Sequence, residues 1–141
     1  MDSVQFIVTG GMEKLALHKA LEKAFPSLNF LEPVHSQGFT SVDISQLLSQ
    51  PDSIEEREID KLVTALFNEI ERRKPADMVI VIDDLETANL HHPECVVQYF
   101  CDAVNSYIHH HQVTQRILKK LHEDCSFHLL VPMAEAYFFG E

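Results

Sequence analysis

The sequence predicts an α/β fold, a three-layer sandwich with a mainly parallel central sheet. Short apolar segments alternate with longer segments of helical periodicity, in the order β-α-β-α-β-α-α-β-α. The apolar segment 78–82 is short, unbroken and rich in β-branched residues, which is typical of a strand buried on both faces of a parallel sheet. A chain of 141 residues suits one domain, so we expect a single unit over residues 1–141.

The first elements are two strands with a helix between them. Residues 4–8 form an apolar strand, and Gly10-Gly11 makes a tight turn after it. Apolar residues at helical spacing then predict a helix over 12–25. Residues 29–31 form a short second strand.

The next part of the chain is the least regular. Segment 32–51 shows no clear period and suggests only a short element over 42–48. Ser53 and Glu56 then form a capping-box pattern, so we expect a long helix from this point to about Arg73.

The second half continues the alternation after the central strand. Pro93 suits the first turn of a helix whose exposed end carries three consecutive histidines. A shorter helix follows over 113–123, a last strand over 127–131, and the start of a further helix over 133–139.

Composition limits the function. The hydrophobic content of 45% and charged content of 23% are those of a soluble globular protein. The net charge of −11 argues against nucleic-acid binding through a basic surface, but not against a nucleic acid held locally through metal ions. The three cysteines form no CxxC motif, so we expect reduced thiols and a cytoplasmic protein without membrane association. The apolar end at 137–141 suggests the N-terminal part of a longer protein.

Acidic residues follow three of the predicted strands. Asp83, Asp84 and Glu86 come after the central strand, Glu13 after the first and Glu135 after the last. Carboxyl ends of parallel strands share one edge, where ligands of open α/β sheets bind. Carboxylate oxygens are the ligands that Mg²⁺ prefers, so these acids predict a site for Mg²⁺ or Mn²⁺. The alternative is polar loops whose acids favour helix N-termini.

Two other motifs carry a weaker signal. Backbone N–H groups of Gly10 and Gly11 are candidates for phosphate binding, although the P-loop spacing is absent and a plain turn explains the pair. Segment 91–95, His-His-Pro-Glu-Cys, lacks a second ligand pair at zinc-finger spacing, which favours a helix start over a zinc site.

Three short motifs resemble those of the Toprim (topoisomerase–primase) domain family. They are FIVTGGME at 6–13, VIVIDDLE at 79–86 and PMAEAY at 132–137. The chain is similar in particular to small Toprim-like proteins among OLD-type nucleases and bacterial antiviral defence systems. The resemblance implies a Mg²⁺-dependent nuclease, a hydrolase acting on nucleic acid. It implies catalytic roles for Glu13, Asp83 and Asp84, and adds Glu86 and Glu135 as metal ligands.

Thr9 departs from the family pattern. It occupies the position where the family has its principal glutamate, and a neutral hydroxyl cannot act as a carboxylate. The alternative function is therefore a catalytically degenerate Toprim-like module that binds a partner protein or a second copy. A receiver-like phosphoacceptor or nucleotide-binding domain, suggested by Asp83, is disfavoured because that pattern has acids directly after the first strand, where this chain has Thr9, Gly10 and Gly11.

Overall fold

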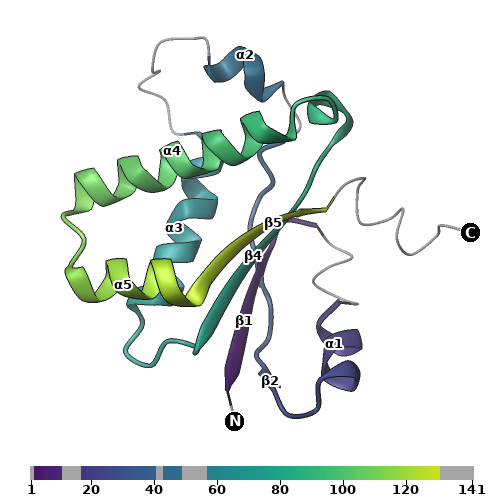
Figure 1. Ribbon diagram of the computed structural model, residues 1–141, viewed down its shortest axis with the longest axis vertical. Helices are drawn as coiled ribbons and strands as arrows, with labels where there is room; N and C mark the ends of the chain where they lie inside the picture. The colour runs from purple at the N-terminus through teal and green to yellow at the C-terminus, as the bar shows by residue number, and fades with distance from the viewer. Residues whose placement is uncertain (1, 11–16, 41–42, 49–56, 131–141) are drawn as a thin grey trace, which may run out of the picture.

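The fold is a parallel sheet between helices (Figure 1). A computed structural model describes residues 2–10, 17–40, 43–48 and 57–130. Its strands are β1 (Ser3–Val8), β2 (Asn29–Phe30), β3 (Val34–His35), β4 (Met78–Asp84) and β5 (Cys125–Leu130). They lie in the order β2-β1-β4-β5, with β3 also beside β1, and every pair is parallel. The predicted α/β fold with a mainly parallel sheet is confirmed.

The short strands β2 and β3 line one side of β1 in succession. β2 pairs with the start of β1 and β3 with its end. The side chain of Gln5 is buried at the interruption between them, and its Nε2 donates to the carbonyl oxygen of Glu32 at 2.8 Å. Gln5 thus satisfies a backbone acceptor that strand pairing leaves open.

Helices lie on both faces of the sheet, with more of them on one face than on the other. They are α1 (His18–Ala24), α2 (Ile44–Leu48), α3 (Glu58–Glu71), α4 (Pro93–His111) and α5 (Gln115–Asp124), with the 3₁₀ helix η2 (Thr87–Asn89) after β4. In Figure 1, α3, α4 and α5 lie on one side of the sheet and α1 on the other. None of the helices in the described ranges is long and apolar enough to cross a membrane.

The alternation of β4 divides its side chains between two apolar clusters. Val79 and Val81 belong to the larger cluster, together with residues of α3 and α4. Ile82 belongs to the smaller cluster beneath α1, which Ile80 also contacts. Since successive strand residues point to opposite faces, Asp83 shares the α3 and α4 face.

Several predicted boundaries were wrong. The last strand begins at Cys125 rather than at residue 127, and the short strand β3 lies in a segment for which no strand was predicted. The central strand ends at Asp84 rather than Ile82, because Asp83 and Asp84 still pair with Leu129 and Leu130 of β5. The long helix begins at Glu58, not after Ser53.

Helix α3 begins late because a different residue pair caps it. Arg57 is extended, its backbone N–H donates to Asp60 Oδ2 at 3.1 Å, and its guanidinium pairs with Asp60 Oδ1 at 3.1 Å. The predicted capping residues at 53–56 and the helix predicted over 133–139 lie outside the described residues.

Candidate metal site at the carboxyl edge of the sheet

Thr9 and Asp83 meet at the carboxyl ends of the two central strands. Val8 is the register partner of Ile82, so the next residues of β1 and β4 lie side by side. The Thr9 hydroxyl donates to Asp83 Oδ1 at 2.5 Å, and the Thr9 backbone N–H donates to the carbonyl oxygen of Ile82 at 3.3 Å. Thr9, which departs from the Toprim pattern, therefore holds one oxygen of the central acid.

The other carboxylate oxygen of Asp83 is buried without a partner. Asp83 is only 1% exposed, and its Oδ2 accepts no hydrogen bond within the described part of the chain. Burial raises the pKa of Asp83 to about 7, and the nearby charges of Asp84 and Glu86 act in the same direction. The hydrogen bond from Thr9 opposes this change by favouring the ionised form. Such an unpaired buried oxygen is unusual in folded proteins and makes Asp83 Oδ2 a candidate ligand atom for a cation.

The chain segment after β3 closes over this pair. A Cβ placed on Gly38 would lie 3.6 Å from Thr9 Cβ and 3.7 Å from Asp83 Oδ1. Hydrogen bonds fix both ends of the segment: Ser36 N–H donates to the carbonyl oxygen of Val8 at 2.9 Å, and the Thr40 hydroxyl to that of Asp84 at 2.7 Å. The segment 36–40 thus holds the ends of β1 and β4 together.

Asn89 extends this framework to the neighbouring helices. Its buried side chain donates from Nδ2 to the carbonyl oxygen of Thr40 at 2.8 Å and accepts at Oδ1 from Ile44 N–H at 2.9 Å. The start of α2, the segment after β3 and η2 are therefore connected through one amide side chain.

The other predicted acids take different positions. Strand alternation directs Asp84 to the α1 face, opposite Asp83, and Asp84 is half-buried. Leu85 is fully buried in the larger cluster, while Glu86 is exposed. Gly10 follows Thr9 and is half-buried. The remaining predicted site residues, Gly11, Glu13 and Glu135, lie outside the described residues.

The donor set at this edge suits a hard divalent cation. Asp83, Asp84 and Glu86 offer carboxylate oxygens within four consecutive positions. In the described part of the chain these three carboxylates do not converge on one point, because Asp84 lies on the opposite face of β4 and Glu86 is exposed. A cation would supply the positive partner that Asp83 Oδ2 lacks. The segment after β3 was missed as part of this site, because Gly38 and Thr40 stand in a region without a recognisable period.

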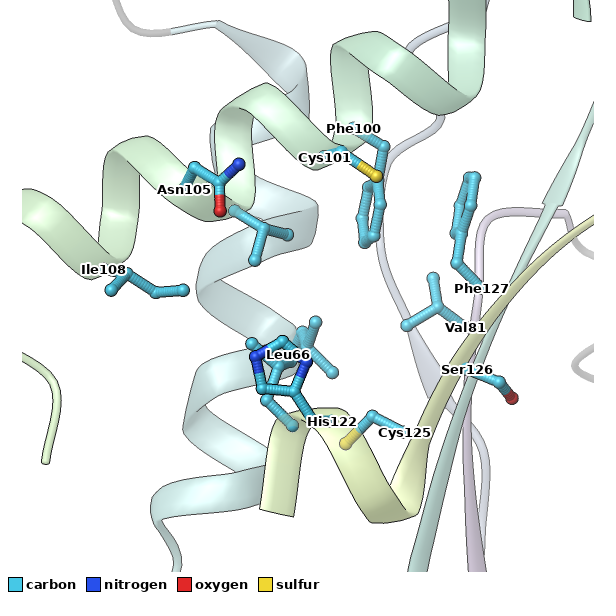
Figure 2. A pocket seen from close by; sticks show the side chains of 12 residues that line it. Leu66, Val81, Phe100, Cys101, Asn105, Ile108, His122, Cys125, Ser126 and Phe127 are labelled. Atoms are coloured by element: carbon cyan, nitrogen blue, oxygen red, sulfur yellow. The ribbon is translucent and has the colours of Figure 1, made fainter. Parts of the chain in front are cut away.

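An apolar cavity of about 300 Å³ lies elsewhere on the α3 and α4 face. Leu66, Val81 and Phe100 are buried in its wall, whereas Asn105 and His122 are exposed. Figure 2 shows the rings of Phe100 and Phe127 facing one another, and they stack at 4.0 Å between centroids. Among the described residues, no acidic side chain lines the cavity. Its lining therefore offers none of the carboxylate oxygens that a hard cation requires.

Cys125 lies in the wall of the same cavity. Burial raises the pKa of its thiol to about 11. The thiol is therefore protonated at neutral pH and is a poor nucleophile. Cys125 therefore gives the cavity no thiolate nucleophile at neutral pH.

Comparisons with protein-family models, with curated proteins and with solved structures give no match. The likeness to Toprim domains thus stays a prediction from three short motifs. The chemistry of the site has to be argued from its own residues.

Proposed function

We propose that the carboxyl edge of the sheet binds a divalent cation, Mg²⁺ or Mn²⁺, and that the domain supports metal-dependent phosphoryl transfer of the nuclease type. The observation that carries this proposal is the buried Oδ2 of Asp83, which has no partner within the described residues. An ionised carboxylate in this position is unfavourable unless a positive charge compensates it. A bound cation provides that charge.

The proposed site assigns a separate role to each of its residues. Asp83 is the buried anchor, and Thr9 positions it by holding Oδ1. The further oxygens are those that the Toprim resemblance assigns, from Asp84 and Glu86 after the central strand and from Glu13 and Glu135. When bound, a divalent cation polarises a phosphoryl oxygen and lowers the pKa of its water. The chain's own contribution is the buried carboxylate of Asp83, held by Thr9 at the sheet edge.

Nucleic acid is the substrate class that the resemblance favours. The net charge of −11 opposes phosphate binding through the protein surface. A cation held by Asp83 would locally reduce that repulsion, because its positive charge would attract a phosphate group. A place in bacterial antiviral defence rests on the resemblance alone.

The test measures cation binding and cleavage with the same protein. Titration calorimetry with Mg²⁺ and Mn²⁺ should show binding to the wild type, with Asp83→Asn weakening it at least about tenfold. Cleavage of single-stranded DNA, double-stranded DNA and RNA should require either ion and be lost in the same variant. Asp102→Asn is the matched control, because Asp102 is an exposed aspartate on α4. If the wild type binds neither ion, the proposed site is wrong.

A non-catalytic binding module is the second candidate function. One observation favours it: Thr9 stands at the position of the family's principal acid, and its hydroxyl is already engaged by Asp83. This candidate predicts cation binding without cleavage, or no cation binding, and in both cases a partner protein or a second copy. Cleavage that depends on Asp83 would exclude it.

A further inference from the structure

We propose that His92, Glu94 and Cys95 form a second metal site, suited to a zinc-class ion and separate from the carboxyl edge. One ligand atom from each side chain lies within 4.8 Å of the other two. His92 Nδ1 and Glu94 Oε1 are 3.6 Å apart. Three potential ligands of different chemistry therefore meet at one point on the surface.

The local backbone explains why these side chains converge. His92 is the N-cap of α4, and its N–H donates to the carbonyl oxygen of Asn89 at 3.0 Å. Cys95 N–H donates to the carbonyl oxygen of His92 at 3.1 Å, which closes the first turn. Pro93 is compatible with this turn because it needs no N–H partner there. The cluster thus stands on a hydrogen-bonded turn that the buried Asn89 anchors.

The donor types select the ion. Imidazole nitrogen, thiolate sulfur and a carboxylate oxygen are the ligands of zinc sites, whereas Mg²⁺ prefers oxygen alone. Three protein ligands leave a fourth tetrahedral position for water.

Access and surroundings also fit an exchangeable ion. The side chains of His92 and Glu94 are 55% and 71% exposed, and Cys95 is half-buried against the larger apolar cluster. The carboxylate of Asp43, ahead of α2, is close enough to interact electrostatically with His92. It adds negative charge beside the cluster, which favours a cation.

The competing explanation is an ordinary helix start with an ion pair between His92 and Glu94. That explanation makes Cys95 a packing residue against the larger apolar cluster and predicts no metal-dependent difference between Cys95 and Cys101. The chain contains matched controls: His91 is the exposed neighbour of His92, and Cys101 is an exposed cysteine two turns further along α4.

The experiment titrates Co²⁺, a spectroscopic substitute for Zn²⁺, into the full chain after chelator treatment under reducing conditions. We expect a sulfur-to-cobalt charge-transfer band that Zn²⁺ abolishes by competition. Cys95→Ser should remove this band, and His92→Ala and Glu94→Gln should weaken affinity roughly tenfold or more. His91→Ala and Cys101→Ser should leave the titration unchanged. Circular dichroism of each variant in chelator verifies folding.

Two results would overturn the proposal. One is a wild type without the charge-transfer band, and the other is a band that persists in Cys95→Ser. The site does not depend on the proposed function, so Asp83→Asn should retain the cobalt spectrum. Its loss in that variant would show that the two ions do not occupy separate sites.

Discussion

The acidic end of β4 and the first turn of α4 lie on either side of η2, yet they hold their polar groups in opposite environments. Asp83 is 1% exposed and bonded through one oxygen only, whereas the side chains of His92 and Glu94 are more than half exposed. Ionising Asp83 costs folding free energy because water is excluded. The side chains of His92 and Glu94, which we call the exposed cluster, remain hydrated. In the absence of ions, the free energy of unfolding should therefore depend strongly on the ionisation of Asp83 and only weakly on the side chains of His92 and Glu94.

The largest expected effect is the pH dependence of stability caused by Asp83. Its pKa is about 7 in the folded protein, above the ordinary value of 3.8 that the unfolded chain retains. The stabilising contribution is therefore complete below about pH 4 and is lost as the pH rises to about 7. The difference between the two pKa values corresponds to about 4 kcal/mol of unfolding free energy between pH 4 and pH 8. Urea denaturation from pH 4 to pH 8 measures it.

Asp83→Asn isolates this contribution from those of the other acids. Asparagine keeps an oxygen that can accept from Thr9 and carries no charge at any of these pH values. The difference between the wild-type and variant curves should fall with rising pH and level off above about pH 7. Parallel curves would contradict the burial of an ionisable carboxylate. Saturating Mg²⁺ at pH 8 should restore part of the lost stability to the wild type alone.

The sequence predicts the strands better than their ends. The unbroken apolar segments reveal β1 and β4, because a doubly covered parallel sheet requires such strands. The last two residues of β4 are set by pairing with β5, which is distant in the chain. Asp83 was therefore predicted to follow the strand, whereas it is a buried member of it.

The contacts within the candidate site are even harder to predict from the sequence than the strand ends. Composition and position identified Asp83, Asp84 and Glu86 as the acids of the central strand. The contact between Thr9 and Asp83 joins residues that are 74 positions apart, and no local pattern predicts it. Gly38 reaches the same site from an irregular segment. The contacts of Asp83 with Thr9 and Gly38 depend on how distant parts of the chain pair in the sheet.

The second expected effect comes from Thr9 and tests how the buried carboxylate is held. Valine has the shape of threonine without the hydroxyl, so Thr9→Val should remove the donor to Asp83 Oδ1, while Oδ2 has no partner among the described residues in either protein. We expect a loss of about 1–3 kcal/mol at pH 8. The pKa of Asp83 should also rise further, because the hydrogen bond that lowers it is gone.

Thr9→Ser provides the matched control, since it keeps the donor. Its stability at pH 8 should lie closer to that of the wild type than that of Thr9→Val does. At pH 5, where Asp83 is protonated, the cost of the valine variant should shrink. An equal cost at both pH values would mean that packing, not the charge of Asp83, explains the loss.

The smallest effect is expected at the exposed cluster. His92 makes no side-chain hydrogen bond as the N-cap of α4, and its ion pair with Glu94 is open to solvent. His92→Ala should therefore change the unfolding free energy in chelator by less than about 0.5 kcal/mol. Urea denaturation of His92→Ala and of the control His91→Ala at pH 7 measures this difference.

A loss as large as that of Thr9→Val would mean that the first turn of α4 stabilises the core through Asn89. The two regions would then not differ in their contribution to stability. A small change in chelator, together with stabilisation by Zn²⁺ in the wild type alone, would mean that the ion and not the helix start gives the cluster its stabilising effect.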